Sequence, residues 1–223
     1  MDISKNEKFA RHFEFSKELI NKNSVYSKQS LYKLANCYLR MDKFIEAKDY
    51  YTQSTMAMFI LPKSWIDTGQ TDWLVNVCVL AGRRDLYSRV VEELDLCKST
   101  AIGTYPIFNY SMCVMDFLGD QKNGPMWIAK LIEKPKIKEA VYMGEAFQAI
   151  LDRNEINLNL ALTNLLVKHQ GKAKHGELRE TAEGLICMTA MTLGYIGLIN
   201  NLHLTVDSEY FSCLYLEFLL KNE

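Results

Sequence analysis

The chain has 223 residues, of which 48% are apolar and 24% are charged, and its formal net charge is −1. This length allows a large core without disulfide or metal staples, and the ordinary charged fraction argues against extensive disorder. A net charge near zero creates no field that would recruit nucleic acid or an anionic membrane. We therefore expect one domain spanning 1–223, with no nucleic-acid partner and no membrane partner.

Targeting and membrane signals are absent from the sequence. Residues 1–8 are polar and mixed in charge, unlike the apolar stretch of a secretory signal. No uninterrupted apolar run reaches the roughly 18 residues of a membrane span. The longest candidate, 185–204, contains Thr, Asn and His residues and is interpreted as a buried helix and its exit. The six cysteines are scattered without a CxxC pair, which favours buried free thiols and a cytoplasmic location.

Apolar residues recur at helical spacing along the chain, whereas strand signals are weak. The four prolines lie near expected helix boundaries, and none occurs after residue 135. Segment 34–58 is similar in its local pattern to one tetratricopeptide hairpin. The apolar stripes, each on one face of a helix, are Leu31, Leu34, Ala35, Tyr38 and Leu39; Phe44, Ala47, Tyr51 and Ser54; Leu74, Val77, Cys78 and Ala81; and Leu158, Ala161, Leu162, Leu165 and Leu166.

Four short polar turns interrupt this helical pattern, at 40–43, 82–85, 119–122 and 152–155. Glycine ends helices cheaply and aspartate caps the next one, so each turn predicts a helical hairpin. Their starts are 42, 37 and 33 residues apart, near the roughly 34–45-residue periods that are typical of helical-hairpin arrays. The predicted fold is all-α: stacked antiparallel helical hairpins, a degenerate helical-repeat-like array, in one globular domain. We expect a hairpin array over 1–152 and a C-terminal helical module over 153–223.

Residues with catalytic or metal-binding chemistry form no known motif. The sequence lacks a glycine-rich phosphate loop, a GxSxG turn and an HExxH pair. His169 and His175 are six residues apart with Gly171 between them, which indicates a loop and favours exposed or capping histidines over metal ligands. Cys187 could meet His169 as a nucleophile pair, but its apolar neighbours favour a core thiol. We expect no catalytic residue, no metal site and no cofactor.

An acidic group near residue 180 is the candidate partner-binding site. Glu177, Glu180 and Glu183 are spaced i, i+3, i+6, which would place them on one helical edge beside Arg179. One interpretation is a solvated first turn whose carboxylates complement the helix dipole. The other is an acidic contact edge that meets a basic surface of a partner protein. The partner-binding prediction consists of these four residues.

The C-terminal third carries a family resemblance. Residues 159–169 form a Leu-rich helical segment, a polar loop follows, Glu183-Gly184 opens a long apolar helix, and Asp-Ser-Glu-Tyr at 207–210 precedes a last apolar segment. This order resembles the family 49 immunity proteins of bacterial polymorphic toxin systems. Trp73 corresponds to the mid-chain tryptophan of that family.

The resemblance implies an all-helical, non-enzymatic bacterial protein that binds a cognate toxin and blocks its active surface. Two alternatives remain from the residues themselves. One is a helical-repeat scaffold or adaptor that holds a peptide or a regulatory protein in a groove. The other is an enzyme whose active site is assembled across several helices.

Overall fold

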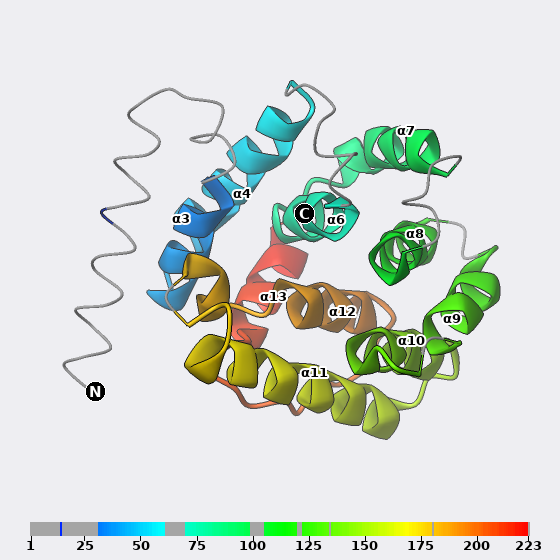
Figure 1. Ribbon diagram of the computed structural model, residues 1–223. Coiled ribbons are helices and arrows are strands. Elements are labelled where there is room, and N and C mark those ends of the chain that lie inside the picture. The colour runs from blue at the N-terminus through cyan, green and yellow to red at the C-terminus, as the bar shows by residue number, and fades with distance from the viewer. Residues whose placement is uncertain are drawn as a thin grey trace.

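Helical hairpins make up the fold of this chain (Figure 1). The structure, a computed structural model, describes Glu14 and residues 31–60, 70–98, 105–119, 122–133, 135–179 and 181–222. These described residues form ten α-helices and no strand, so the predicted all-α fold of stacked antiparallel hairpins in one globular domain is confirmed. The helices are α3 (Leu31–Arg40), α4 (Phe44–Met58), α6 (Thr71–Leu80), α7 (Tyr87–Cys97), α8 (Pro106–Leu118), α9 (Gly124–Ile132), α10 (Lys138–Leu151), α11 (Glu155–His175), α12 (Met188–Ile199) and α13 (Cys213–Lys221), with short 3-10 helices η1 (Arg84–Leu86) and η3 (Ala182–Leu185).

Each predicted turn joins two antiparallel helices, giving the pairs α3–α4, α6–α7, α8–α9 and α10–α11. Three turns reverse the chain with a left-handed residue, at Asp42 (φ 57°), Gly82 (φ 61°) and Arg153 (φ 52°). At the start of α11 the side chain of Asn154 accepts a hydrogen bond of 3.0 Å from the Asn157 backbone N–H. That bond satisfies a donor at the helix start, as N-cap residues do.

Helix α12 occupies the interior of the molecule. It packs against α6, α8, α10, α11 and α13, and Figure 1 shows it enclosed by them. Its sequence is apolar on every side, which is the pattern of a fully buried helix. Two glycines allow close packing: a Cβ at Gly194 would lie 2.8 Å from the Phe211 ring, and one at Gly197 would lie 2.6 Å from the Leu158 side chain. The hairpins therefore close around α12 instead of forming an open array.

The C-terminal helix α13 ties the end of the chain to the first hairpin. Tyr215 is fully buried, and its hydroxyl donates a 2.6 Å hydrogen bond to the Leu80 carbonyl at the end of α6. Its ring centroid lies 5.6 Å from that of Phe44 and 6.2 Å from that of Tyr51, both on α4. One side chain thus joins three helices that are far apart in sequence.

The division into an array over 1–152 and a module over 153–223 stays a prediction. Helices α10 and α11 lie on either side of residue 152 as one hairpin, and α12 packs among helices of both parts. Within the described ranges, no helix is both long enough and apolar enough to cross a membrane.

Candidate functional site

His169 is buried in the interior, so the prediction of an exposed or capping histidine is wrong at this position. The predicted loop is also wrong, because α11 continues through Gly171 and ends at His175. The Nε2 atom of His169 lies 3.3 Å from the Gly184 carbonyl oxygen, and its ring meets Tyr210 edge-on at 5.2 Å. Burial lowers the pKa of His169 more than the bond to Gly184 raises it, so the neutral ring donates to that carbonyl.

Cys187 is a core thiol, as its apolar neighbours indicate. It is buried, and burial raises the pKa of its thiol to about 12, so the nucleophilic thiolate is not formed near neutral pH. Its backbone N–H donates to the Tyr210 carbonyl at 2.9 Å. In the described part of the chain, no three His, Cys, Asp or Glu residues gather in a way that could hold a metal ion.

The described candidates Glu177, Arg179 and Glu183 do not share one helical edge. Helix α11 ends before Gly176, whose extended backbone turns the chain away, and only the short η3 follows. Glu177 and Arg179 are exposed in this turn, and Glu183 lies in η3. Glu180 lies outside the described residues. An i, i+3, i+6 edge requires a continuous helix, and the structure has no continuous helix through the described residues 176–179 and 181–183.

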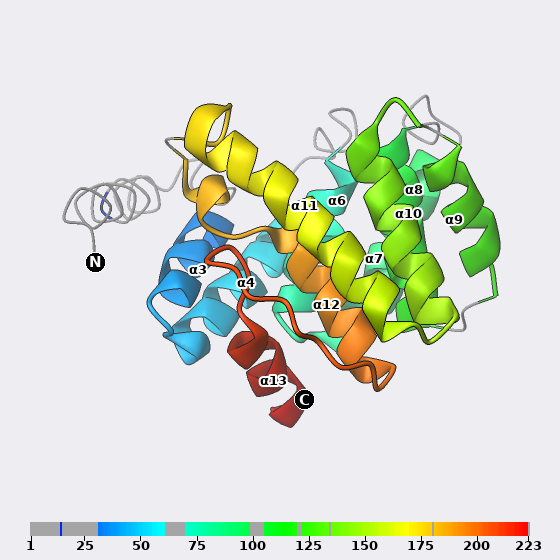
Figure 2. The same ribbon diagram turned by 90° about the horizontal axis from the view of Figure 1, so that it is seen from below.

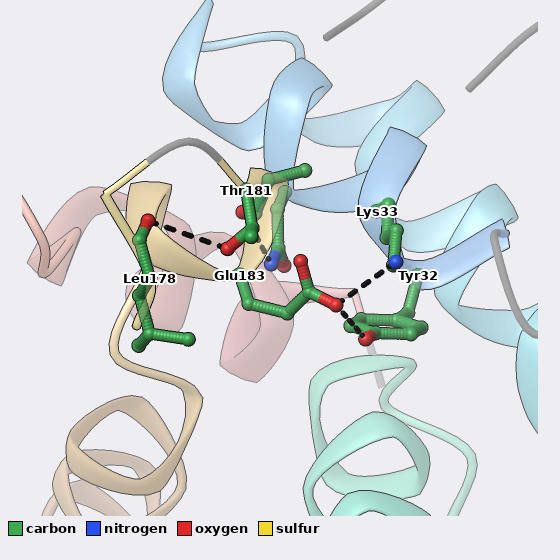
Figure 3. A network of polar contacts seen from close by, with 7 residues as sticks. Tyr32, Lys33, Leu178, Thr181 and Glu183 are labelled. Atoms are coloured by element: carbon green, nitrogen blue, oxygen red, sulfur yellow. Dashed lines mark hydrogen bonds and ion pairs between the residues drawn. The ribbon is translucent and has the colours of Figure 1, made fainter. Parts of the chain in front are cut away.

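Figure 3 shows the Glu183 side chain pointing from η3 toward Tyr32 and Lys33 of α3. Its Oε1 atom accepts a 2.6 Å hydrogen bond from the Tyr32 hydroxyl and lies 3.0 Å from the Nζ atom of Lys33. Burial by itself raises the pKa of this carboxyl, but the bond from Tyr32 and the charge of Lys33 outweigh it and hold the pKa below its usual range. Glu183 is therefore ionised at neutral pH and joins η3 to α3.

Gly184 completes this junction, and its environment explains the Glu-Gly step. A Cβ at Gly184 would meet the Leu178 carbonyl oxygen well inside the 3.0 Å that real Cβ atoms keep. The backbone of the turn before η3 thus packs directly on residue 184. We call Glu183, Gly184 and their partners Tyr32, Lys33 and His169 the η3 junction. It connects α3 to the C-terminal helices.

Glu177 is the candidate most open to a partner. Its side chain is 70% exposed, and its Oε1 atom lies 3.5 Å from the Nζ atom of Lys172. Lys172 makes a closer ion pair of 2.9 Å with Glu139 on α10. Exposed ion pairs contribute little to stability, so Glu177 can exchange this contact for one with another protein at small cost.

Two surface hollows lie on either side of the extended segment 206–209, and neither was predicted from the sequence. One has a volume of 390 Å³ and lies between this segment and the outer side of α11, where Val167 and Gln170 line it. The other has a volume of 280 Å³ and lies toward the α3–α4 turn and α13. Arg40 and Glu209 form an ion pair of 3.1 Å across the second hollow. The sequence signal that could have indicated the first hollow is Val167, an apolar residue that falls outside the buried stripe of α11.

Asp72 makes the stability of the fold dependent on pH. It is half-buried in the first turn of α6. Burial raises the pKa of its carboxyl from 3.8 to about 6, although backbone N–H groups of Asp72 and Trp73 act in the opposite direction. The folded chain therefore holds a proton between about pH 4 and pH 6 that the unfolded chain releases. Through this window the contribution of Asp72 to stability falls as the pH rises.

Replacing Asp72 by asparagine is expected to raise the free energy of unfolding by about 2 kcal/mol near pH 7, because the amide keeps an acceptor and carries no charge. Near pH 4 the gain is expected to vanish, since the folded aspartic acid is then neutral as well. Thermal unfolding of both proteins at the two pH values measures the difference. An equal gain at both values would show that ionisation is not the cause.

Comparisons with protein-family models, with curated proteins and with solved structures found no match to this chain. Its function is therefore inferred from its residues and their geometry, together with the resemblance described above. That geometry separates the candidates: Glu183 is an internal contact, and Glu177 and Arg179 are exposed.

Proposed function

We propose that this chain is an immunity protein that binds a cognate bacterial toxin and occludes its active surface. The observation that carries the proposal is the convergence of the three resembling segments on His169. This residue ends the segment 159–169, its Nε2 atom lies 3.3 Å from the carbonyl of Gly184, and its ring packs against Tyr210 of the segment 207–210. Features that are separate in the sequence thus belong to one spatial unit.

The proposed mechanism is steric occlusion by a rigid helical surface. Closure around α12 makes the molecule stiff, so little ordering entropy opposes binding. Complementary charge at the rim of the contact would speed association with a basic toxin surface. We place this rim at Glu177 and Arg179, in the turn that follows α11, and at Glu180, the next residue of the sequence. Glu183 has an indirect role, because its contacts with Tyr32 and Lys33 fix that turn.

Co-expression with the protein encoded immediately upstream tests the function. Expression of that protein alone is expected to stop growth of the host, and co-expression of this chain is expected to restore it. The control is the same plasmid with the start codon of this chain removed. The immunity function is wrong if the upstream protein alone is harmless, or if growth stops despite this chain.

The proposed contact has its own test. Charge reversal in Glu177→Lys is expected to weaken the complex about tenfold, mainly through slower association. The matched control is Glu145→Lys, which makes the same change at an exposed position of α10. Binding kinetics of both variants give the comparison. If Glu177→Lys binds like the control while growth is still rescued, the contact is misplaced but the function stands.

A further inference from the structure

The outward side of α11 carries three large aliphatic side chains that the described part of the chain leaves exposed. Ile156 is 81% exposed, Leu160 is 58% exposed and Val167 is 62% exposed. At 3.6 residues per turn, they fall within roughly 40° of one another around the helix. Figures 1 and 2 place α11 at the outside of the molecule, with α12 behind it. We call these three residues the α11 stripe. Exposed apolar patches of this kind mark interaction surfaces.

Gly171 extends the α11 stripe by one turn beyond Val167. Glycine inside a helix is unfavourable, and it is usually retained where a larger side chain would not fit. A Cβ at Gly171 would meet nothing within 4 Å. The described part of the chain therefore gives no steric reason for this glycine. A neighbour from outside the molecule would supply one.

The stripe is complementary to itself. When two α11 helices pack antiparallel around a two-fold axis between residues 163 and 164, Ile156 of each copy faces Gly171 of the other. In the same register Leu160 faces Val167 of the other copy. Ile156 thus meets a residue without a side chain, Leu160 and Val167 meet each other, and the same patch is used on both copies, as a two-fold interface requires. The 390 Å³ hollow lined by Val167 and Gln170 lies beside the stripe, between α11 and segment 206–209.

The charges along α11 favour the same antiparallel arrangement. Its first turn carries Glu155, and the exposed Asp152 lies just before the helix. The one positive charge at this end is that of Arg153. Its last turn carries Lys172, Lys174 and His175. Antiparallel packing places the acidic start of each helix beside the basic end of the other and opposes the two helix dipoles favourably.

We propose that the chain forms a two-fold symmetric homodimer through the α11 stripe, with Ile156 of each copy seated against Gly171 of the other. A contact between single helices is at the small end of specific interfaces, so micromolar or weaker affinity is expected. The assembly does not depend on the proposed function, because it needs no toxin.

Analytical ultracentrifugation of the purified chain over a range of concentrations tests the dimer. The mass is expected to rise with concentration from 25.7 kDa toward twice that value. Leu160→Lys is expected to remain at the mass of one chain throughout, because it buries a charge at the centre of the stripe. The matched control is Ile45→Lys on α4, where the replaced side chain is 73% exposed, and it should dimerise like the unaltered chain.

Gly171→Gln separates association from folding, because it is expected to keep or raise the stability of the single chain and to lower the affinity of the dimer. Glutamine favours the helix over glycine, so the thermal midpoint of dilute protein should rise or stay unchanged. The larger side chain should clash with the incoming Ile156 and weaken the dimer at least tenfold.

Two results would overturn the dimer. The first is a single-chain mass for the unaltered protein at every concentration. The second is a dimer that persists in Leu160→Lys. If the chain is monomeric and its toxin neutralisation is lost in Leu160→Lys but kept in Ile45→Lys, the stripe is a contact for the toxin. Growth rescue by the unaltered chain is measured separately from its mass, so failure of the dimer leaves the immunity function intact.

Discussion

Gly184→Ala is expected to lower the free energy of unfolding by about 3 kcal/mol, at the upper end of overpacking effects. The added methyl group would collide with the Leu178 carbonyl oxygen, which belongs to the backbone and cannot rotate away. Relief would require movement of the turn before η3 or of Gly184 itself, whose carbonyl accepts from His169. For a chain of this size, the thermal midpoint should fall by roughly 6–12 °C.

The control for this prediction is the same substitution at Gly171. There a Cβ meets nothing within 4 Å, so alanine should raise the free energy of unfolding by up to about 1 kcal/mol in dilute solution. The two glycines thus differ in the sign of the expected change. A Gly184→Ala protein that unfolds at the temperature of the unaltered chain would show that the η3 junction tolerates a side chain there.

Tyr215→Ala is expected to lower the free energy of unfolding by about 3–5 kcal/mol, the usual result of removing a fully buried aromatic ring. The ring fills the space between α13, α6 and α4, so its loss leaves a cavity where the chain closes. Tyr215→Phe keeps the ring and leaves the Leu80 carbonyl without its 2.6 Å donor, which should cost about 1–2 kcal/mol.

Denaturant unfolding of the two Tyr215 variants separates packing from hydrogen bonding. Tyr105→Ala is the control, because this tyrosine is 50% exposed and its loss should change stability by less than about 0.5 kcal/mol. Equal losses in Tyr215→Ala and Tyr215→Phe would assign the whole effect to the hydrogen bond. An unchanged free energy of unfolding in Tyr215→Ala would contradict closure of the fold through α13.

Local pattern was sufficient to predict the helices and the turns that pair them. Asp42, Gly82 and Arg153 lie where polar residues interrupt the apolar spacing, and each is left-handed in the structure. Gly171 shows where local pattern was insufficient. Its propensity suggested a loop, but the buried face of α11 holds the helix together through that position, because tertiary packing outweighs the roughly 1 kcal/mol cost of glycine.

The candidate site depended on contacts that sequence spacing does not contain. Glu183 binds Tyr32, which is 151 residues earlier in the chain, and His169 reaches Gly184 because the turn after α11 folds back. A helical edge through Glu177 and Glu183 requires a continuous helix, but α11 ends before Gly176. Closure around α12 likewise results from the packing of several apolar faces, which a list of separate hairpins does not specify.

Binding a toxin and blocking its activity is the function that we propose for this chain. The most direct measurement is a titration of the purified toxin domain, encoded by the adjacent upstream gene, with this chain while the toxin's own activity is followed. We expect activity to fall in proportion to the chain added and to reach background once the toxin is saturated at a fixed stoichiometric ratio. Toxin activity that stays unchanged in excess of this chain would contradict the proposed immunity function.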